Sequence, residues 1–203
     1  MPMFNKIREI IFKYRKIIKE LFIILLIAGI FRSVIYEPYV VPSQSMLPTL
    51  IEGDRIIISK FSYGISRYSF PFSPPIFKGR LFQLNKPNRG DIIVFEQDKI
   101  YVKRLVGLPG DTIQVVHGTL YINGQTVDRK LIKPFIYKQS KTPQYLEKFS
   151  NGHEHTILDL DPYSEFDNTR LFKVPEKHYF VMGDNRDNSR DSRDSAGIGF
   201  VHE

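Results

Sequence analysis

The chain has 203 residues, contains no cysteine and carries a formal net charge of +7. The missing cysteine excludes disulfide bonds, thiolate metal sites and cysteine nucleophiles, and the length is sufficient for one core with a smaller inserted lobe. Much of the excess positive charge gathers near the N-terminus, which favours an anionic membrane leaflet as its partner. Because no basic and aromatic alternation or base-reading motif follows, we expect no nucleic-acid partner.

The N-terminal segment predicts a membrane anchor. Its unbroken apolar run, Leu21–Phe31, has 11 residues, whereas a membrane span needs roughly 20. Extension to residues 17–36 supplies that length, with Lys19 and Arg32 near the ends, where long side chains can reach the headgroups. The alternatives are an amphipathic or core helix and a cleaved secretory signal, but Phe31–Ile35 offers no small-x-small cleavage site.

The basic residues before the apolar run predict the orientation of the anchor. Lysine and arginine accumulate on the cytoplasmic side of a membrane helix. We therefore expect a cytoplasmic segment over residues 1–16, a transmembrane anchor over residues 17–36, and a domain on the far side over residues 37–203.

After Pro42 the apolar runs are short and rich in β-branched residues, and turn signals such as His117-Gly118 and Asn123-Gly124 separate them. This pattern predicts a mostly β fold, an antiparallel sheet or barrel-like domain with almost no helix beyond the anchor. The predicted strands are Arg55–Ser59, Asp91–Phe95, Ile100–Val106, Thr112–Val116, Thr119–Ile122, Leu171–Val174, Tyr179–Met182 and Ile198–Val201.

Two segments depart from the strand pattern. Tyr63–Pro87 is rich in proline and aromatic residues, which predicts an extended apolar surface loop that contacts the bilayer. Residues from about 130 to 168 are polar and aperiodic, which predicts an insertion away from the functional site. We expect the histidines His153, His155 and His178 to be solvated, since their spacing matches no known metal site. The loop's apolar side chains are Phe70, Phe72, Ile76 and Phe77.

Two segments suggest nucleophilic chemistry. Pro42–Leu50 contains Ser43 and Ser45, and Tyr101–Arg104 contains Lys103, but neither segment has a histidine to serve as a base. A lysine can replace histidine only when neutral, which requires burial to lower its pKa from about 10.4. Strand alternation places Lys103 on the same face as two apolar neighbours. The alternative is an ordinary strand lysine that reaches solvent.

The third segment, Gly183–Arg193, alternates acidic and basic residues. A calcium-binding loop is one interpretation, but the spacing does not match the EF-hand pattern and the arginines would oppose a cation. A disordered charged tail is another, although strand-like residues flank the segment on both sides. We therefore predict no metal site and an ordered structural role.

These three segments, in this order and preceded by Arg32–Pro38, resemble the type I signal peptidase family, and the resemblance extends from about Arg32 to the C-terminus. It implies a membrane-bound serine endopeptidase without a cofactor, which removes N-terminal signal peptides from exported preproteins cut after a small-x-small sequence. It also implies a single-pass protein of the bacterial inner membrane with its catalytic domain on the outer, periplasmic side.

The resemblance implies roles for individual residues. Ser45 is the nucleophile and Lys103 the general base, while the Ser43 hydroxyl and the Ser45 N–H stabilise the oxyanion. Ser189 hydrogen-bonds the lysine amine. Further support for this Ser/Lys dyad comes from Asp184 and from an ion pair between Asp191 and Arg193. The implied substrate pocket comprises Tyr39, Val41, Pro42, Met46, Leu50, Ile56, Tyr101 and Val102.

The sequence departs from the family pattern in three places. Gln44 stands where many members have glycine, Asp194–Ile198 lengthens the last motif, and relatives commonly continue into a further strand after Glu203. Two other functions stay open at this point. One is a self-cleaving repressor-type protease, which would need a DNA-binding helical domain, and the other is an inactive membrane-anchored β-domain that binds peptides.

Overall fold

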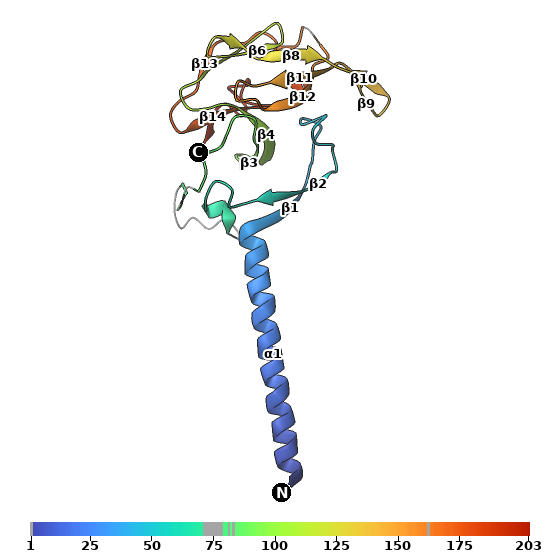
Figure 1. Ribbon diagram of the computed structural model, residues 1–203, viewed down its shortest axis with the longest axis vertical. Helices are drawn as coiled ribbons and strands as arrows, with labels where there is room; N and C mark the ends of the chain where they lie inside the picture. The colour runs from blue at the N-terminus through green and yellow to red at the C-terminus, as the bar shows by residue number, and fades with distance from the viewer. Residues whose placement is uncertain (1, 71–78, 81, 83, 162) are drawn as a thin grey trace. The chain divides into compact units, whose positions relative to one another are not determined.

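The computed structural model describes residues 2–70, 79–80, 82, 84–161 and 163–203 (Figure 1). The chain forms two compact units. The first comprises Met1–Pro38 and Ile57–Asn85, and the second comprises Tyr39–Ile56 and Lys86–Glu203. The serine segment, the lysine segment and the charged segment Gly183–Arg193 singled out above all belong to the second unit.

The first unit contains one long helix, α1 (Pro2–Ile35), and a short 3-10 helix, η1 (Arg67–Ser69). Helix α1 is continuous through residues 16 and 17, so the predicted cytoplasmic segment and the predicted anchor form one helix. Among the described residues, no helix reaches the combined length and mean hydropathy that a membrane span requires. Of the apolar loop predicted to contact the bilayer, Phe70 is described and half-buried, whereas Phe72, Ile76 and Phe77 lie outside the described residues.

The serine motif, Pro42–Leu50, lies in the connection between two paired strands, β1 (Tyr36–Val40) and β2 (Arg55–Ser59). Just beyond the strands, the Val41 N–H donates to the Asp54 carbonyl and the Gly53 N–H donates to the Val41 carbonyl, both at 2.9 Å. These two hydrogen bonds close the loop of residues 42–52, which connects β1 to β2 and contains the serine motif.

The lysine motif lies in a four-stranded antiparallel sheet of order β15-β14-β4-β3. The inner strand β4 is buried at every position from Tyr101 onwards, because Val106 joins the apolar core on one face and Tyr101 and Leu105 join the core on the other. The faces of β14 alternate as a strand requires: Phe180 and Met182 join one apolar core, and Tyr179 and Val181 join the other. The bounds are β3 (Ile92–Glu96), β4 (Ile100–Gly107), β14 (His178–Met182) and β15 (Val201–His202).

A second antiparallel sheet, of order β13-β5-β6-β7, packs its apolar side chains with Phe180 and Met182 of β14 in the first core. Its tight turns confirm the sequence signals. His117 and Gly118 have φ values of 47° and 71°, and Asn123 and Gly124 have values of 54° and 76°, as hairpins with two-residue loops require. The bounds are β5 (Thr112–Val116), β6 (Thr119–Ile122), β7 (Gln125–Thr126) and β13 (Phe172–Lys173).

The polar segment from 130 to 168 is more regular than its sequence indicates. It carries most of a three-stranded antiparallel sheet of order β12-β11-β8 and a separate hairpin of β9 and β10. The sequence analysis did not predict these strands, because they bury only some of their side chains and so lack a long apolar alternation. The bounds are β8 (Asp128–Leu131), β9 (Phe135–Tyr137), β10 (Ser140–Thr142), β11 (Gln144–Lys148) and β12 (Glu154–Leu158).

The fold is thus mostly β with one N-terminal helix, as predicted. Most predicted strands agree with the structure within a residue or two. The last one does not: the prediction was Ile198–Val201, whereas β15 begins at Val201. The difference has a local cause, because the Asp194 carbonyl and carboxylate bind the backbone N–H groups of Gly197 and Gly199 in a turn before the strand.

Candidate active site

Ser45 and Lys103 are in direct contact, although 58 positions separate them in the sequence. The Lys103 Nζ atom lies 2.6 Å from the Ser45 Oγ atom. Both residues are buried, with 8 % of Ser45 and 3 % of Lys103 exposed. Lys103 projects from the middle of β4, on the face that carries the buried Tyr101 and Leu105 and opposite Ile93 of β3, and these apolar neighbours explain how a strand lysine comes to be enclosed.

The surroundings of Lys103 favour its neutral form. Burial lowers the pKa of its amine to about 8, and the carboxylates of Asp191 and Asp184 oppose this shift in part. At the ordinary pKa of about 10.4, the neutral amine would be scarce near neutral pH. The lowered value brings Lys103 into the range where a lysine can accept a proton.

The turn around Ser45 is held from the third motif by Asn185. Its backbone N–H donates to the Ser45 carbonyl at 3.1 Å, and its Nδ2 donates to the Gln44 carbonyl at 3.0 Å. Since the peptide bond is planar, holding the Gln44 carbonyl on one side directs the Ser45 N–H to the opposite side. The Ser43 Oγ lies 3.3 Å from the Ser45 Oγ. The sequence argument assigned no role to Asn185.

A bidentate ion pair joins the second motif to the third. Arg104 Nε and Nη2 lie 2.8 and 2.6 Å from the two carboxylate oxygens of Asp184, and both side chains are buried. Thr49, at the end of the serine turn, donates its hydroxyl to Asp184 at 2.5 Å. Asp184 therefore connects the serine turn to the lysine strand, and the arginine beside Lys103 takes part in this connection from the opposite face of β4.

Asp191 and Arg193 form the ion pair that the resemblance implies. Arg193 Nε and Nη2 each lie 2.9 Å from one Asp191 oxygen, and both side chains are buried. Asp191 also accepts the Gly183 N–H at 3.0 Å. Burial would raise the pKa of Asp191, but the Arg193 guanidinium and the N–H of Gly183 hold it below its ordinary value.

Ser189 does not make the predicted hydrogen bond to the lysine amine. Its Oγ is buried and finds no hydrogen-bond partner in the described part of the chain. The side chain instead packs against Gly183, where a Cβ atom would lie 2.1 Å from the Ser189 Oγ and 2.5 Å from the Ser45 carbonyl oxygen. Because Gly183 has no side chain, the Ser189 side chain and the Ser45 backbone can both lie close to the Gly183 Cα atom.

We expect Gly183→Ala to reduce turnover by about 100-fold, because the added methyl group would displace the Ser45 backbone and a displacement of about 1 Å can have that effect. Steady-state cleavage of a preprotein would measure it. Gly29→Ala is the control, because a Cβ at Gly29 meets nothing within 4 Å. Wild-type turnover in Gly183→Ala would contradict the tight packing described here.

The segment predicted to be remote from the site contacts it. Glu147 of β11 is fully buried and pairs with Arg186 of the third motif at 2.9 and 2.5 Å. His155 of β12 is also buried rather than solvated, with its Nε2 3.3 Å from Glu147. His153 lies 3.2 Å from Arg104. The sequence analysis assigned none of these contacts, because the third motif has as many aspartates as arginines and so indicates no distant partner.

The predicted pocket residues belong to the same unit as the dyad and differ in exposure. Val41, Met46, Tyr101 and Val102 are buried. Tyr39, Leu50 and Ile56 are half-buried, and Pro42 is exposed.

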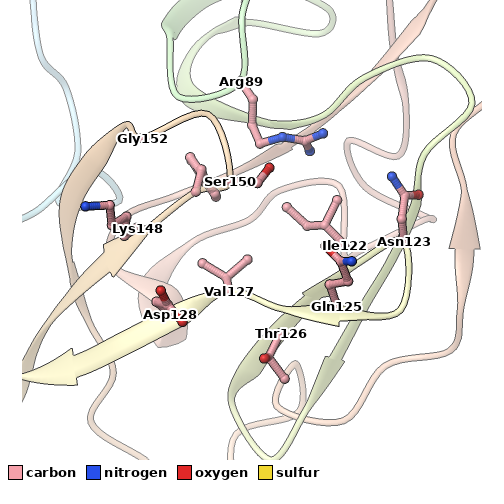
Figure 2. Close-up of a pocket in the computed structure, with 11 residues that line it drawn as sticks. Arg89, Ile122, Asn123, Gln125, Thr126, Val127, Asp128, Lys148, Ser150 and Gly152 are labelled. Atoms are coloured by element: carbon pink, nitrogen blue, oxygen red, sulfur yellow. The ribbon is translucent and has the colours of Figure 1, made fainter.

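The second unit also contains a cavity of about 360 Å³, and none of its lining residues belongs to the three motifs (Figure 2). Ser150 and Gly152 lie on one side of it, and Val127 and Thr126 on another (Figure 2). It is therefore distinct from the predicted substrate pocket.

Comparison with known proteins defines the class to which this fold and site belong. Residues 14–203 match the family described as signal peptidase, peptidase S26. Signal peptidase I of Rickettsia rickettsii (strain Sheila Smith) is 41 % identical over 88 % of this chain and 71 % of its own length. Signal peptidase I of Rickettsia typhi (strain Wilmington) is 39 % identical over 93 % of this chain and 77 % of its own length.

A crystal structure of a signal peptidase I from Enterococcus faecalis V583 is 31 % identical and covers 59 % of this chain and 92 % of that one, with a TM-score of 0.34. The chain belongs to the signal peptidase I family of S26 serine endopeptidases, which remove signal peptides from secreted preproteins and are membrane-bound. This membership decides between the functions that the sequence left open, in favour of the signal peptidase.

Proposed function

We propose that this chain cleaves exported preproteins with Ser45 as its nucleophile and neutral Lys103 as its general base. The observation that carries the proposal is the contact of 2.6 Å between the Lys103 Nζ and the Ser45 Oγ. A buried amine with a pKa of about 8 is a suitable base for a hydroxyl, because it can be neutral at moderately alkaline pH and still accept a proton.

In the first step, the Ser45 Oγ attacks the carbonyl carbon of the scissile peptide bond while its proton passes to the Lys103 Nζ. The carbonyl oxygen gains the negative charge. The Ser45 N–H and the Ser43 hydroxyl donate hydrogen bonds to it. The support for this pair is the hydrogen bond from Asn185 to the Gln44 carbonyl, which orients the Ser45 N–H, and the proximity of the two serine hydroxyls.

In the second step, the Lys103 ammonium returns its proton to the leaving amine as the peptide C–N bond breaks. This leaves the acyl group on Ser45 and a neutral lysine. A water molecule then loses a proton to Lys103 and attacks the ester, and the same proton returns to Ser45 as the acyl group departs. One base therefore serves both halves of the reaction, as microscopic reversibility requires.

The substrate would bind as an added strand, with small side chains in shallow apolar pockets. The pocket residues predicted for this task, from Tyr39 to Val102, are mostly apolar. Val41 and Met46 precede and follow Ser45, and Tyr101 and Val102 precede Lys103. Such surroundings fit alanine-like side chains on either side of the dyad, as a small-x-small cleavage sequence presents them.

The proposed topology places the basic N-terminus in the cytoplasm and the catalytic unit on the outer side of the bacterial inner membrane. Its support is the surplus of lysine and arginine before Leu21. Protease added to spheroplasts should digest the catalytic unit, and complete protection would contradict the orientation.

The direct test of the proposed activity uses the full chain in detergent. Purified protein is incubated with a preprotein, and the cut is located by mass spectrometry. We expect a single cleavage after a small-x-small sequence at the end of the signal peptide. Cleavage at unrelated positions, or no cleavage of several preproteins, would overturn the proposal.

We expect turnover to rise with pH and level off above about 8, the pKa of Lys103. The sign follows from the protonation states, because only the neutral amine can accept the Ser45 proton. At pH 7 about one tenth of Lys103 would be neutral, so turnover should increase roughly tenfold between pH 7 and the plateau. Initial rates measured at saturating substrate would check this, and a rate that is constant from pH 6 to 9 would contradict it.

A further inference from the structure

Three carboxylates outside the dyad converge in the catalytic unit. Asp159 follows β12, Asp167 lies farther along the same connection, and Asp187 belongs to the short 3-10 helix η2 (Arg186–Asn188) of the third motif. One oxygen from each of them lies within 4.8 Å of the other two. Asp159 and Asp167 are buried, and Asp187 is half-buried.

Asp167 is the more deeply buried of the two buried aspartates, and one of its carboxylate oxygens accepts no hydrogen bond from the described residues. Only 2 % of this residue is exposed, and its buried Oδ2 has no hydrogen-bond partner among the described residues. The same holds for the Oδ1 of Asp187, whose Oδ2 accepts the backbone N–H groups of Leu160 and Asp161. Buried carboxylate oxygens normally have partners, so two unpartnered oxygens in one cluster indicate that a group is missing from it.

The nearby cations do not balance the three carboxylates. Arg129 pairs with Asp159 at 2.5 Å. The other arginines close to the cluster are already paired, Arg186 with Glu147 and Arg193 with Asp191. Three carboxylates and one guanidinium carry a net charge of −2 when all are ionised, which is the charge that a divalent cation neutralises.

We infer that Asp159, Asp167 and Asp187 form a binding site for a calcium ion. Calcium takes oxygen ligands at about 2.3–2.6 Å in flexible geometry, so two ligands on opposite sides of the ion lie about 4.6–5.2 Å apart. The three oxygens lie within 4.8 Å of one another, so one calcium ion can contact all of them. Magnesium demands near-ideal octahedral geometry and loses its waters reluctantly, whereas three carboxylates from separate segments suit the flexible coordination of calcium. Water molecules would supply the remaining ligands.

Bound calcium would join the segment that carries Asp159 and Asp167 to Asp187 of η2, which lies two residues before Ser189. This connection would add to the parallel bridge that already links Leu158 with Asn185. Because Asn185 holds the serine turn, the ion would stabilise the part of the unit on which the turn rests. The site itself does not depend on the roles proposed for the dyad.

The test is direct calcium binding to the full chain in detergent at pH 7.5, by isothermal titration with calcium chloride alone. We expect one ion per chain with a dissociation constant of about 10⁻⁴–10⁻³ M, the range of extracellular calcium sites. Asp167→Asn should lose this binding. The matched control is Glu165→Gln, which removes the same charge from an exposed position on the same connection and should bind as the wild type does.

Thermal unfolding provides a second measurement. In 10 mM calcium the wild-type Tm should rise by roughly 3–6 °C over its value in chelator at equal ionic strength. Asp167→Asn should show no rise, and in chelator it should be at least as stable as the wild type, because the substitution removes carboxylate repulsion. If the wild type binds no calcium up to 10 mM, or if Asp167→Asn binds it equally well, the carboxylates share a proton instead and the inference is wrong.

Discussion

Replacing either Ser45 or Lys103 with alanine is expected to abolish preprotein cleavage, with turnover lowered at least roughly 10⁴-fold in each case. The two side chains are 2.6 Å apart and act on one proton, so neither should function without the other. The double variant should for the same reason be little worse than either single variant. Single-turnover cleavage with excess enzyme would measure the residual rates.

The controls for this prediction separate the chemistry from the folding. Lys103→Arg should be as inactive as Lys103→Ala, since a guanidinium does not release its proton in this pH range. Lys99→Ala and Ser140→Ala change exposed residues of the same types and should retain activity. Circular dichroism should show folded protein in all variants. Substantial cleavage by Lys103→Ala would reject the assignment of the base.

Asp191→Ala is expected to cause the largest loss of stability. It leaves the Arg193 guanidinium buried and unpaired, which typically costs about 3–5 kcal/mol. For a chain of this size the Tm should fall by roughly 6–20 °C. Turnover should fall as well, because Asp191 also accepts the N–H of Gly183, on which the serine turn packs. Calorimetry and cleavage assays on the same preparation would measure both effects.

Two further variants test whether the loss of stability arises because the pair of Asp191 and Arg193 is buried. Glu154→Gln breaks the exposed pair of Lys148 and Glu154 and should change the Tm little. Replacing both partners, as Asp191→Leu with Arg193→Met, should recover much of the lost stability, because no buried charge is left alone. In Asp191→Ala the pH at half-maximal turnover should also move below about 8, since the Asp191 carboxylate raises the pKa of Lys103. An Asp191→Ala protein of wild-type Tm would show that the pair contributes nothing.

The sequence predicted the fold where local signals were strong. Alternating β-branched runs located β4, β5, β6 and β14, and the pairs His117-Gly118 and Asn123-Gly124 specified their turns. The sheet of β8, β11 and β12 was missed. Its strands contribute few fully buried residues, such as Glu147 and Ile157, and one of these is charged, so no hydrophobic periodicity marks them.

The site was predictable as a set of motifs but not as a network of contacts. The resemblance to signal peptidases named Ser45, Lys103 and the pair of Asp191 and Arg193. It could not predict that Glu147 pairs with Arg186, because a partner from a different sheet leaves no trace in local spacing. The aspartate cluster was missed for the same reason.

The charge state of Lys103 is the central claim, and it can be measured directly. Lysine labelled with ¹³C at Cε is incorporated into the full chain, and the Lys103 signal is identified by its loss in Lys103→Gln. Its chemical shift is then followed from pH 6 to 11. We predict a titration midpoint of about 8, whereas the other lysines should titrate near the ordinary pKa of about 10.4. A Lys103 midpoint at or above 10 would contradict a neutral general base and with it the proposed mechanism.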